Sequence, residues 1–145
     1  MHSPLEEIIE TFASVDAEMR IELLLDYAKR LPELPERFHA ARAADENRVH
    51  ECMTPVYLFV EEDDDDGVAV FADVARESPT IAGFVSLVIE SMRGATRIDY
   101  AQLPGDLAER LRLTEVLRMN RAVGLAAVIG RIRNAVLQLG KAHVD

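Results

Sequence analysis

The chain has 145 residues, of which 49% are apolar and 29% are charged. This balance supplies enough apolar surface for one packed core and excludes long-range disorder. Sixteen Lys and Arg against 26 Asp and Glu give a formal net charge of -10, which disfavours nucleic acid and an anionic membrane surface as partners because both would repel the chain. We therefore expect a single globular domain over residues 1–145.

Targeting signals are not evident from the sequence. The segment Met1–Glu7 lacks the basic and apolar regions of an export signal. The longest run without a charged or strongly polar residue, Ala122–Gly130, is much shorter than the roughly 20 residues that a membrane-spanning helix needs. We therefore expect no transmembrane helix and a cytoplasmic location.

The N-terminal part of the chain predicts two amphipathic helices. A capping box in Ser3–Glu6, with Pro4 at the first helical position, predicts where the first helix begins. The apolar pattern restarts after Ser14–Asp16. The two stripes are Leu5, Ile8, Ile9 and Phe12, then Ile21, Leu24, Leu25, Ala28 and Leu31. Pro32 and Pro35 end the second helix, and the charged segment up to Glu46 holds at most a broken helix.

The middle of the chain predicts an antiparallel hairpin in a small sheet of about three strands. Residues that favour strands fill Thr54–Val60 and Val68–Val74. Between them, Glu61–Gly67 contains six consecutive carboxylates that repel one another into solvent, followed by a glycine that suits a turn. The run Asp63–Asp66 lacks the spaced ligands of a calcium loop, so we interpret it as a charged hairpin tip.

The C-terminal half predicts helices that cover the hairpin. Ser78 and Pro79 begin a helix that extends to Gly94, and a shorter helix follows Pro104–Gly105. The last helix has the strongest apolar stripe, formed by Leu125, Val128, Ile129, Ile132, Val136 and Leu139. This order of helices, strands and helices predicts an α+β fold in which amphipathic helices cover a small antiparallel sheet.

Cys52 is the residue type that points most directly to chemistry. It is the only cysteine, so it forms no intramolecular disulfide and is a poor start for a structural zinc site. Residue type alone leaves two interpretations open, a reactive thiol on a loop or a small buried apolar residue. Arg48 and His50 would stabilise a thiolate, whereas Glu51 would oppose it. His50 with Cys52 is too small a ligand set, so we expect no metal site.

Three short stretches resemble the SufE family of sulfur-acceptor proteins. They are Leu31–Pro35, then Glu46–Cys52 followed by the strand that begins at Val56, and Arg121–Leu125 at the start of the last helix. The resemblance extends over roughly Ile21 to Arg133, and the order and spacing of the stretches fit the same α+β layout.

The resemblance implies that Cys52 accepts persulfide sulfur from a cysteine desulfurase of the SufS type and stimulates its turnover. The sulfur would feed iron–sulfur cluster assembly, with a cluster-scaffold complex as a further partner. Pyridoxal phosphate would belong to the desulfurase, so we expect no cofactor in this chain and no autonomous enzyme. A lone thiol suits a carrier because no resolving thiol lies nearby to release the sulfur. Arg121 matches the family arginine near the cysteine loop or the partner, although the alternative is a solvated or capping residue.

The chain departs from the family pattern at two places. Many members have glycine immediately before the cysteine, where this chain has Glu51, and Ala72–Ser78 replaces a loop rich in Gly, Asp and Ser. These departures motivate an alternative, a non-covalent interaction module that docks on a partner while Cys52 stays buried and inert. A cysteine hydrolase ranks last because His50 is too close along the chain to act as the base.

Overall fold

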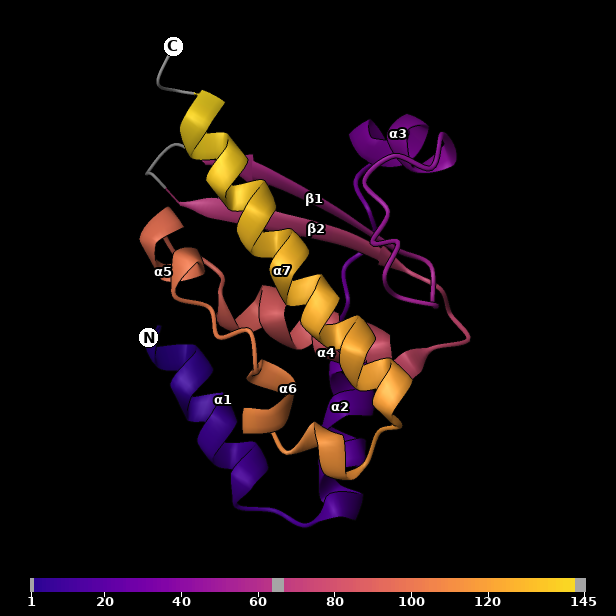
Figure 1. Ribbon diagram of the computed structural model, residues 1–145, viewed down its shortest axis with the longest axis vertical. Coiled ribbons are helices and arrows are strands. Elements are labelled where there is room, and N and C mark those ends of the chain that lie inside the picture. Colours follow the sequence, from indigo (N-terminus) through magenta and orange to yellow (C-terminus); the bar gives the residue numbers. More distant parts are fainter. Residues whose placement is uncertain (1, 64–66, 143–145) are drawn as a thin grey trace.

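The computed structural model describes residues 2–63 and 67–142. Its elements in chain order are α1 (Ser3–Ala13), α2 (Ala17–Lys29), the 3-10 turn η1 (Glu36–Phe38), α3 (His39–Ala43), β1 (Val56–Glu62), β2 (Val68–Val74), α4 (Pro79–Ser91), α5 (Arg97–Ala101), α6 (Leu107–Arg110), η2 (Leu113–Glu115) and α7 (Met119–Ala142). Helix α7 crosses the hairpin and packs on β1, while α4 packs on β2 and on α2 (Figure 1). The α+β fold class expected from the sequence is confirmed.

The sheet consists of β1 and β2 paired antiparallel, with Val56 opposite Val74 and Glu62 opposite Val68. In the described part of the chain it has two strands, whereas we expected about three. A third segment reaches the outer edge of β1 through a single bridge between Arg48 and Tyr57. It extends no further because the preceding residue, Asn47, has a φ of 62° and is not extended.

The hairpin tip is described only at its two ends. The Asp63 N–H donates to the Gly67 carbonyl (3.0 Å), and the Gly67 N–H donates to Asp63 Oδ1 (3.0 Å). The expected acidic tip lies partly outside the described residues, because Asp64–Asp66 are among those that the structure does not describe.

Helix starts follow the sequence with two differences. The capping box at Ser3 was wrong, since His2 is the N-cap and its carbonyl accepts from the N–H groups of Leu5 and Glu6 (3.1 and 3.2 Å). Helix α5 was missed because its five residues are too few for an apolar period. Its start is nevertheless fixed by a complete capping box between Thr96 and Asp99.

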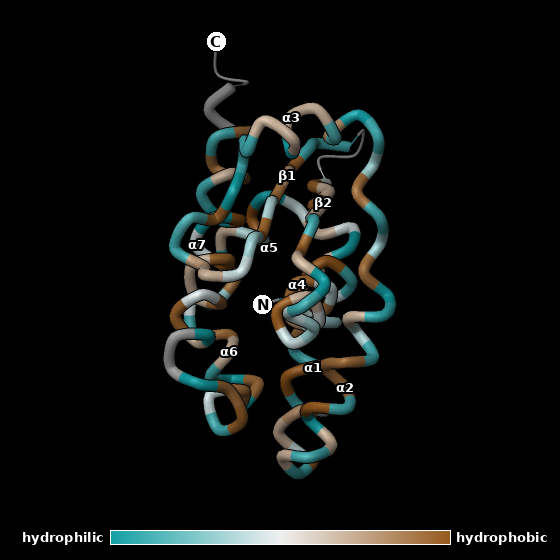
Figure 2. The backbone as a smooth tube through the Cα atoms, turned by 90° about the vertical axis from the view of Figure 1, so that its right-hand side faces the viewer, coloured by the Kyte–Doolittle hydropathy of each residue, from teal (hydrophilic) through white to brown (hydrophobic). Residues whose placement is uncertain are grey.

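One hydrophobic core joins the helices to the hairpin. Figure 2 shows apolar positions of α1, α2 and α4 gathered where these helices meet. Helices α2 and α4 approach each other at Gly83, where a Cβ would lie 2.1 Å from the Leu24 carbonyl oxygen. Only glycine fits this contact, because any side chain would force the two backbones apart.

Helix α7 contributes its predicted stripe to this core. Leu125, Val128, Ile129, Ile132 and Val136 are buried and Leu139 packs at the edge. By length and hydropathy alone, Arg121–Leu139 could cross a membrane, although its longest run without a charged or strongly polar residue is Ala122–Gly130. Since the apolar face of α7 packs against β1, α4, α5 and α6, we interpret it as a core helix.

Candidate functional site

Cys52 lies in the loop that leads into β1. The Val49 N–H donates to the Val56 carbonyl (2.8 Å), which closes this loop, and the Cys52 N–H donates to the Val49 carbonyl (3.2 Å), which makes a turn within it. Asp45 and Asn47 both have a φ of 62° and reverse the chain after α3. The loop is therefore fixed to β1 by backbone hydrogen bonds on both sides of the cysteine.

The Cys52 side chain is only 4% exposed because it faces α7. A Cβ placed on Gly124 of α7 would lie 3.0 Å from Cys52 Sγ. The group that packs against Gly124 is therefore the cysteine itself. Any larger residue at position 124 would compete with the thiol for the same space.

A pocket of about 300 Å³ opens beside the cysteine. Its walls come from three parts of the chain, the cysteine loop, the start of α4 and the start of α7. The lining residues are Cys52, Met53, Thr54, Pro55, Glu77, Ser78, Ile81 and Arg121. Cys52 thus lies between the core and a surface pocket.

Two hydrogen bonds attach the cysteine loop to the segment before α4. Thr54 Oγ1 lies 2.9 Å from Ser78 Oγ, and the Ala75 N–H donates to the Pro55 carbonyl at 3.1 Å. Ser78 occupies the N-cap position that the sequence predicted, but its hydroxyl makes no capping bond to the helix. Its partner is the cysteine loop instead.

Arg121 joins the starts of α4 and α7 at the pocket. It is exposed, and its guanidinium donates to Thr80 Oγ1 (3.0 Å). The structure therefore places this residue at the same pocket as Cys52, which is one of the two positions that the sequence left open for it.

His50 and Glu51 are exposed and do not line this pocket. His50 instead lies near Asp45 at the base of the loop. The Tyr57 hydroxyl donates to Asp45 Oδ1 (2.5 Å). This hydrogen bond, with the charges of Arg48, His50 and Arg42, holds the pKa of Asp45 below its usual value against the opposing effect of desolvation.

Sequence reasoning missed the hydroxyl groups around the pocket. Thr54 and Ser78 each precede a proline, and that repeated pattern was the only signal. Nothing in it indicates that two residues separated by 24 positions meet. Within residues 2–63 and 67–142, no group of three or more His, Cys, Asp or Glu side chains is arranged to hold a metal ion.

Comparison with known proteins gives concordant matches. The SufE family, described as the Fe-S metabolism associated domain, matches residues 6–136. Uncharacterized SufE-like proteins from two strains of Mycobacterium tuberculosis are each 32% identical over 131 residues, which cover 90% of this chain and 90% of the relative. A SufE-like protein from Synechocystis is 28% identical over 142 residues, covering 96% and 85% of the two chains.

A solved structure supports the same assignment. The solution structure of a hypothetical protein from Thermus thermophilus has a TM-score of 0.79 and 27% identity, and the similarity covers 93% of this chain and 94% of that one. The resemblance seen in the sequence is confirmed. The chain belongs to the SufE family, whose domain is associated with iron–sulfur metabolism.

Proposed function

We propose that this protein accepts sulfur on Cys52 from a SufS-type cysteine desulfurase and delivers it to iron–sulfur cluster assembly in the cytoplasm. The observation that carries the proposal is that the only thiol of the chain lines a surface pocket. Pyridoxal phosphate belongs to the desulfurase, where free cysteine provides the sulfur. A cluster-scaffold complex is the proposed receiver.

The transfer is an exchange between a thiolate and a persulfide. The Cys52 thiolate attacks the outer sulfur of the desulfurase persulfide, a bond forms between Cys52 Sγ and that sulfur, and the sulfur–sulfur bond on the desulfurase breaks. The desulfurase cysteine leaves as a thiolate, and Cys52 then holds one additional sulfur. No external oxidant or reductant is needed. Turnover rises because the desulfurase cysteine is free for another cycle.

Sulfur transfer requires the cysteine loop to open when the partner docks. Cys52 is 4% exposed, but the neighbouring Met53 is 82% exposed and offers an apolar group to a docking surface. The Thr54–Ser78 hydroxyl contact and the bond between Ala75 and Pro55 hold the loop against the segment before α4. Each contributes about 1 kcal/mol, so a docked partner can offset their loss.

Arg121 is the proposed supporting cation. Its place at the pocket allows it to stabilise the negative charge on the Cys52 thiolate before attack and on the terminal sulfur afterwards. We assign His50 and Glu51 a supporting part only in partner docking, because both are exposed on the loop outside the pocket.

Intact mass spectrometry tests the proposal. The chain, incubated with a cysteine desulfurase and free cysteine, should gain about 32 Da, the mass of one sulfur, at its thiol. Cys52→Ser should gain nothing and should no longer stimulate sulfide release. Arg110→Gln, on an exposed arginine of α6, is the matched surface control and should behave as the native chain. Sulfur gain or full stimulation by Cys52→Ser would refute the assignment.

The non-covalent interaction module is the second candidate, and the burial of Cys52 against Gly124 is the observation that favours it. In that case the protein binds the desulfurase while its thiol stays inert. A titration that shows binding, together with an unchanged mass after incubation with the desulfurase and free cysteine, would select the module over the carrier.

A further inference from the structure

The outer edge of β2 presents backbone groups that point away from β1. In a strand, the N–H and C=O of successive residues point to alternate sides. The Val68 N–H donates outward to the Ala95 carbonyl (3.0 Å), whereas the Ala75 N–H donates inward to the Pro55 carbonyl (3.1 Å). With the register of the hairpin, this alternation directs the N–H and C=O groups of Val70 and Ala72 outward.

These outward groups have no hydrogen-bond partner in the part of the chain that the structure describes. Val70 and Ala72 are also nearly buried, at 6% and 3% exposure. Their side chains belong to the core, but the outward backbone groups do not, and backbone N–H and C=O groups in folded proteins are almost always paired with protein or with water. The edge of β2 is therefore prepared for a main-chain partner that the chain itself does not provide here.

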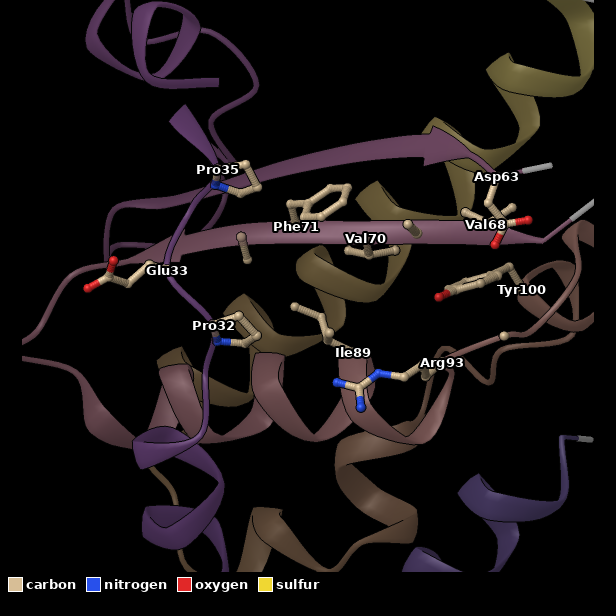
Figure 3. A pocket seen from close by; sticks show the side chains of 13 residues that line it. Pro32, Glu33, Pro35, Asp63, Val68, Val70, Phe71, Ile89, Arg93 and Tyr100 are labelled. Carbon is tan, nitrogen blue, oxygen red and sulfur yellow. The ribbon is translucent and has the colours of Figure 1, made fainter. Parts of the chain in front are cut away.

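The same edge lines an apolar groove of about 300 Å³ (Figure 3). Five consecutive residues, 68–72, form one wall. Side chains that alternate between two faces would not all border one cavity, so this pattern shows that the backbone edge itself faces the groove. Ile89 of α4 and Tyr100 of α5 lie on the opposite side and leave room for apolar side chains.

The two ends of the groove limit the length of the segment that fits. At the Val68 end, the sheet edge is already paired through the bridge between Gly67 and Thr96. At the Ala72 end, the segment with Pro32 and Pro35 crosses the edge (Figure 3), and neither proline has an N–H group to pair with it. At about 3.3 Å per residue, a segment of roughly five residues fits between these ends.

Two charged residues border the groove. The Arg93 side chain extends along the α4 side of the groove to a position beneath Ile89, whereas the Glu33 carboxylate points away from the groove (Figure 3). At the Val68 end, a carboxylate oxygen of Asp63 accepts from the Gly67 N–H, so the negative charge there disfavours an acidic residue at that end. A segment that lies along β2 would instead favour an acidic residue where it passes the Arg93 guanidinium.

We propose that this groove binds a short extended segment of a partner protein, which adds as an antiparallel strand to the outer edge of β2. The segment alternates two apolar residues with polar ones and carries an acidic residue that faces Arg93. A second copy of this chain is a poor occupant. Its own β2 edge is recessed in the same groove and cannot enter another one. The proposal does not depend on Cys52.

Peptide titration tests the proposal. The probe is the peptide acetyl-Lys-Val-Thr-Val-Glu-amide, added to the isotope-labelled full chain and followed by the amide NMR signals of Val70 and Ala72. We expect saturable shifts of both signals and binding about tenfold weaker after N-methylation of the amides that face β2. Absence of saturable shifts, or equal binding of the N-methylated peptide, would overturn the proposal.

Two variants test the protein side of the same contact. Ala72→Pro removes one outward N–H and should weaken peptide binding. Arg93→Gln should weaken binding of the Glu-containing peptide but not of a Gln-containing analogue, and Arg110→Gln is the matched control. Since Ala72→Pro could disturb packing, the N-methylated peptide and Arg93→Gln provide independent tests. Dimerisation that rises with concentration and is abolished by Ala72→Pro would identify a second copy as the occupant and refute the proposal.

Discussion

The two outer edges of the β1–β2 hairpin differ in how they are covered. The edge of β1 is paired with the cysteine loop, since the Leu58 N–H donates to the Asn47 carbonyl (3.0 Å) and the Val56 carbonyl accepts from Val49. Among the described residues, the edge of β2 is paired only near Val68. Under our two proposals, one hairpin serves two tasks. The loop on its covered edge holds the thiol that a docked partner uncovers, and its other edge offers backbone groups for recognition.

A matched pair of proline substitutions in β2 has the largest expected effect and tests which N–H groups of this strand point to β1. Ala69→Pro removes an N–H that points to β1 and should lower the free energy of unfolding by about 3 kcal/mol. Ala72→Pro removes an N–H that points to the open groove, so the loss should be less than about half of that. Urea denaturation measures both. Equal losses would mean that the alternation assigned to β2 is wrong.

Two glycines of α7 test how closely the thiol of Cys52 packs against this helix. A Cβ on Gly130 would meet nothing within 4 Å, so Gly130→Ala should stabilise the helix by about 0.5–1 kcal/mol. Gly124→Ala places its Cβ 3.0 Å from Cys52 Sγ and should fall short of Gly130→Ala by about 1 kcal/mol. It should also speed alkylation of Cys52. Equal stabilisation by the two variants would contradict the close packing of the thiol.

The hydroxyl contact between the loop and α4 predicts a smaller effect. Thr54→Val removes the partner of Ser78 Oγ and should destabilise the closed loop by about 1 kcal/mol, which makes Cys52 alkylation about fivefold faster. Thr11→Val is the control, because the Thr11 hydroxyl donates to the Glu7 carbonyl within α1, far along the chain from the cysteine loop. Alkylation kinetics monitored by mass spectrometry compare the variants. An unchanged rate in Thr54→Val would show that the contact does not hold the loop closed.

The smallest effect concerns the base of the cysteine loop at low pH. The pKa of Asp45 is lowered in the folded state chiefly by the Tyr57 hydroxyl. The resulting stabilisation is present above the pKa of the unfolded state and is lost as the pH falls through the lower pKa of the folded state, below about pH 4. Tyr57→Phe should raise the pKa of Asp45 in a carboxyl NMR titration. An unchanged pKa of Asp45 in this variant would show that the hydrogen bond from Tyr57 does not lower it.

Periodic features of the fold could be predicted from the sequence, and isolated contacts could not. The stripe of α7 follows from regular apolar spacing over several turns, and the two strands follow from runs of residues that favour strands. Helix α5 was missed because it is short, and the cap of α1 was placed one residue late. The expected third strand stops at one bridge because of the φ of Asn47.

The candidate site was predicted in part for a similar reason. Cys52 and Arg121 could be singled out by residue type and family resemblance, and both line the pocket. The contacts of the thiol with Gly124 and of Thr54 with Ser78 depend on how distant segments pack. The unpaired edge of β2 depends on register and on what lies beside it. None of these three features leaves a local pattern in the sequence.

The alkylation rate of Cys52 in the free protein and in its complex with a cysteine desulfurase tests the central claim most directly. The cysteine-containing peptide, analysed by mass spectrometry, reports this residue alone. The account predicts slow alkylation in the free protein and much faster alkylation once the partner is bound, because docking opens the covered edge of the hairpin. An equally slow rate in a complex shown to be fully formed would contradict it.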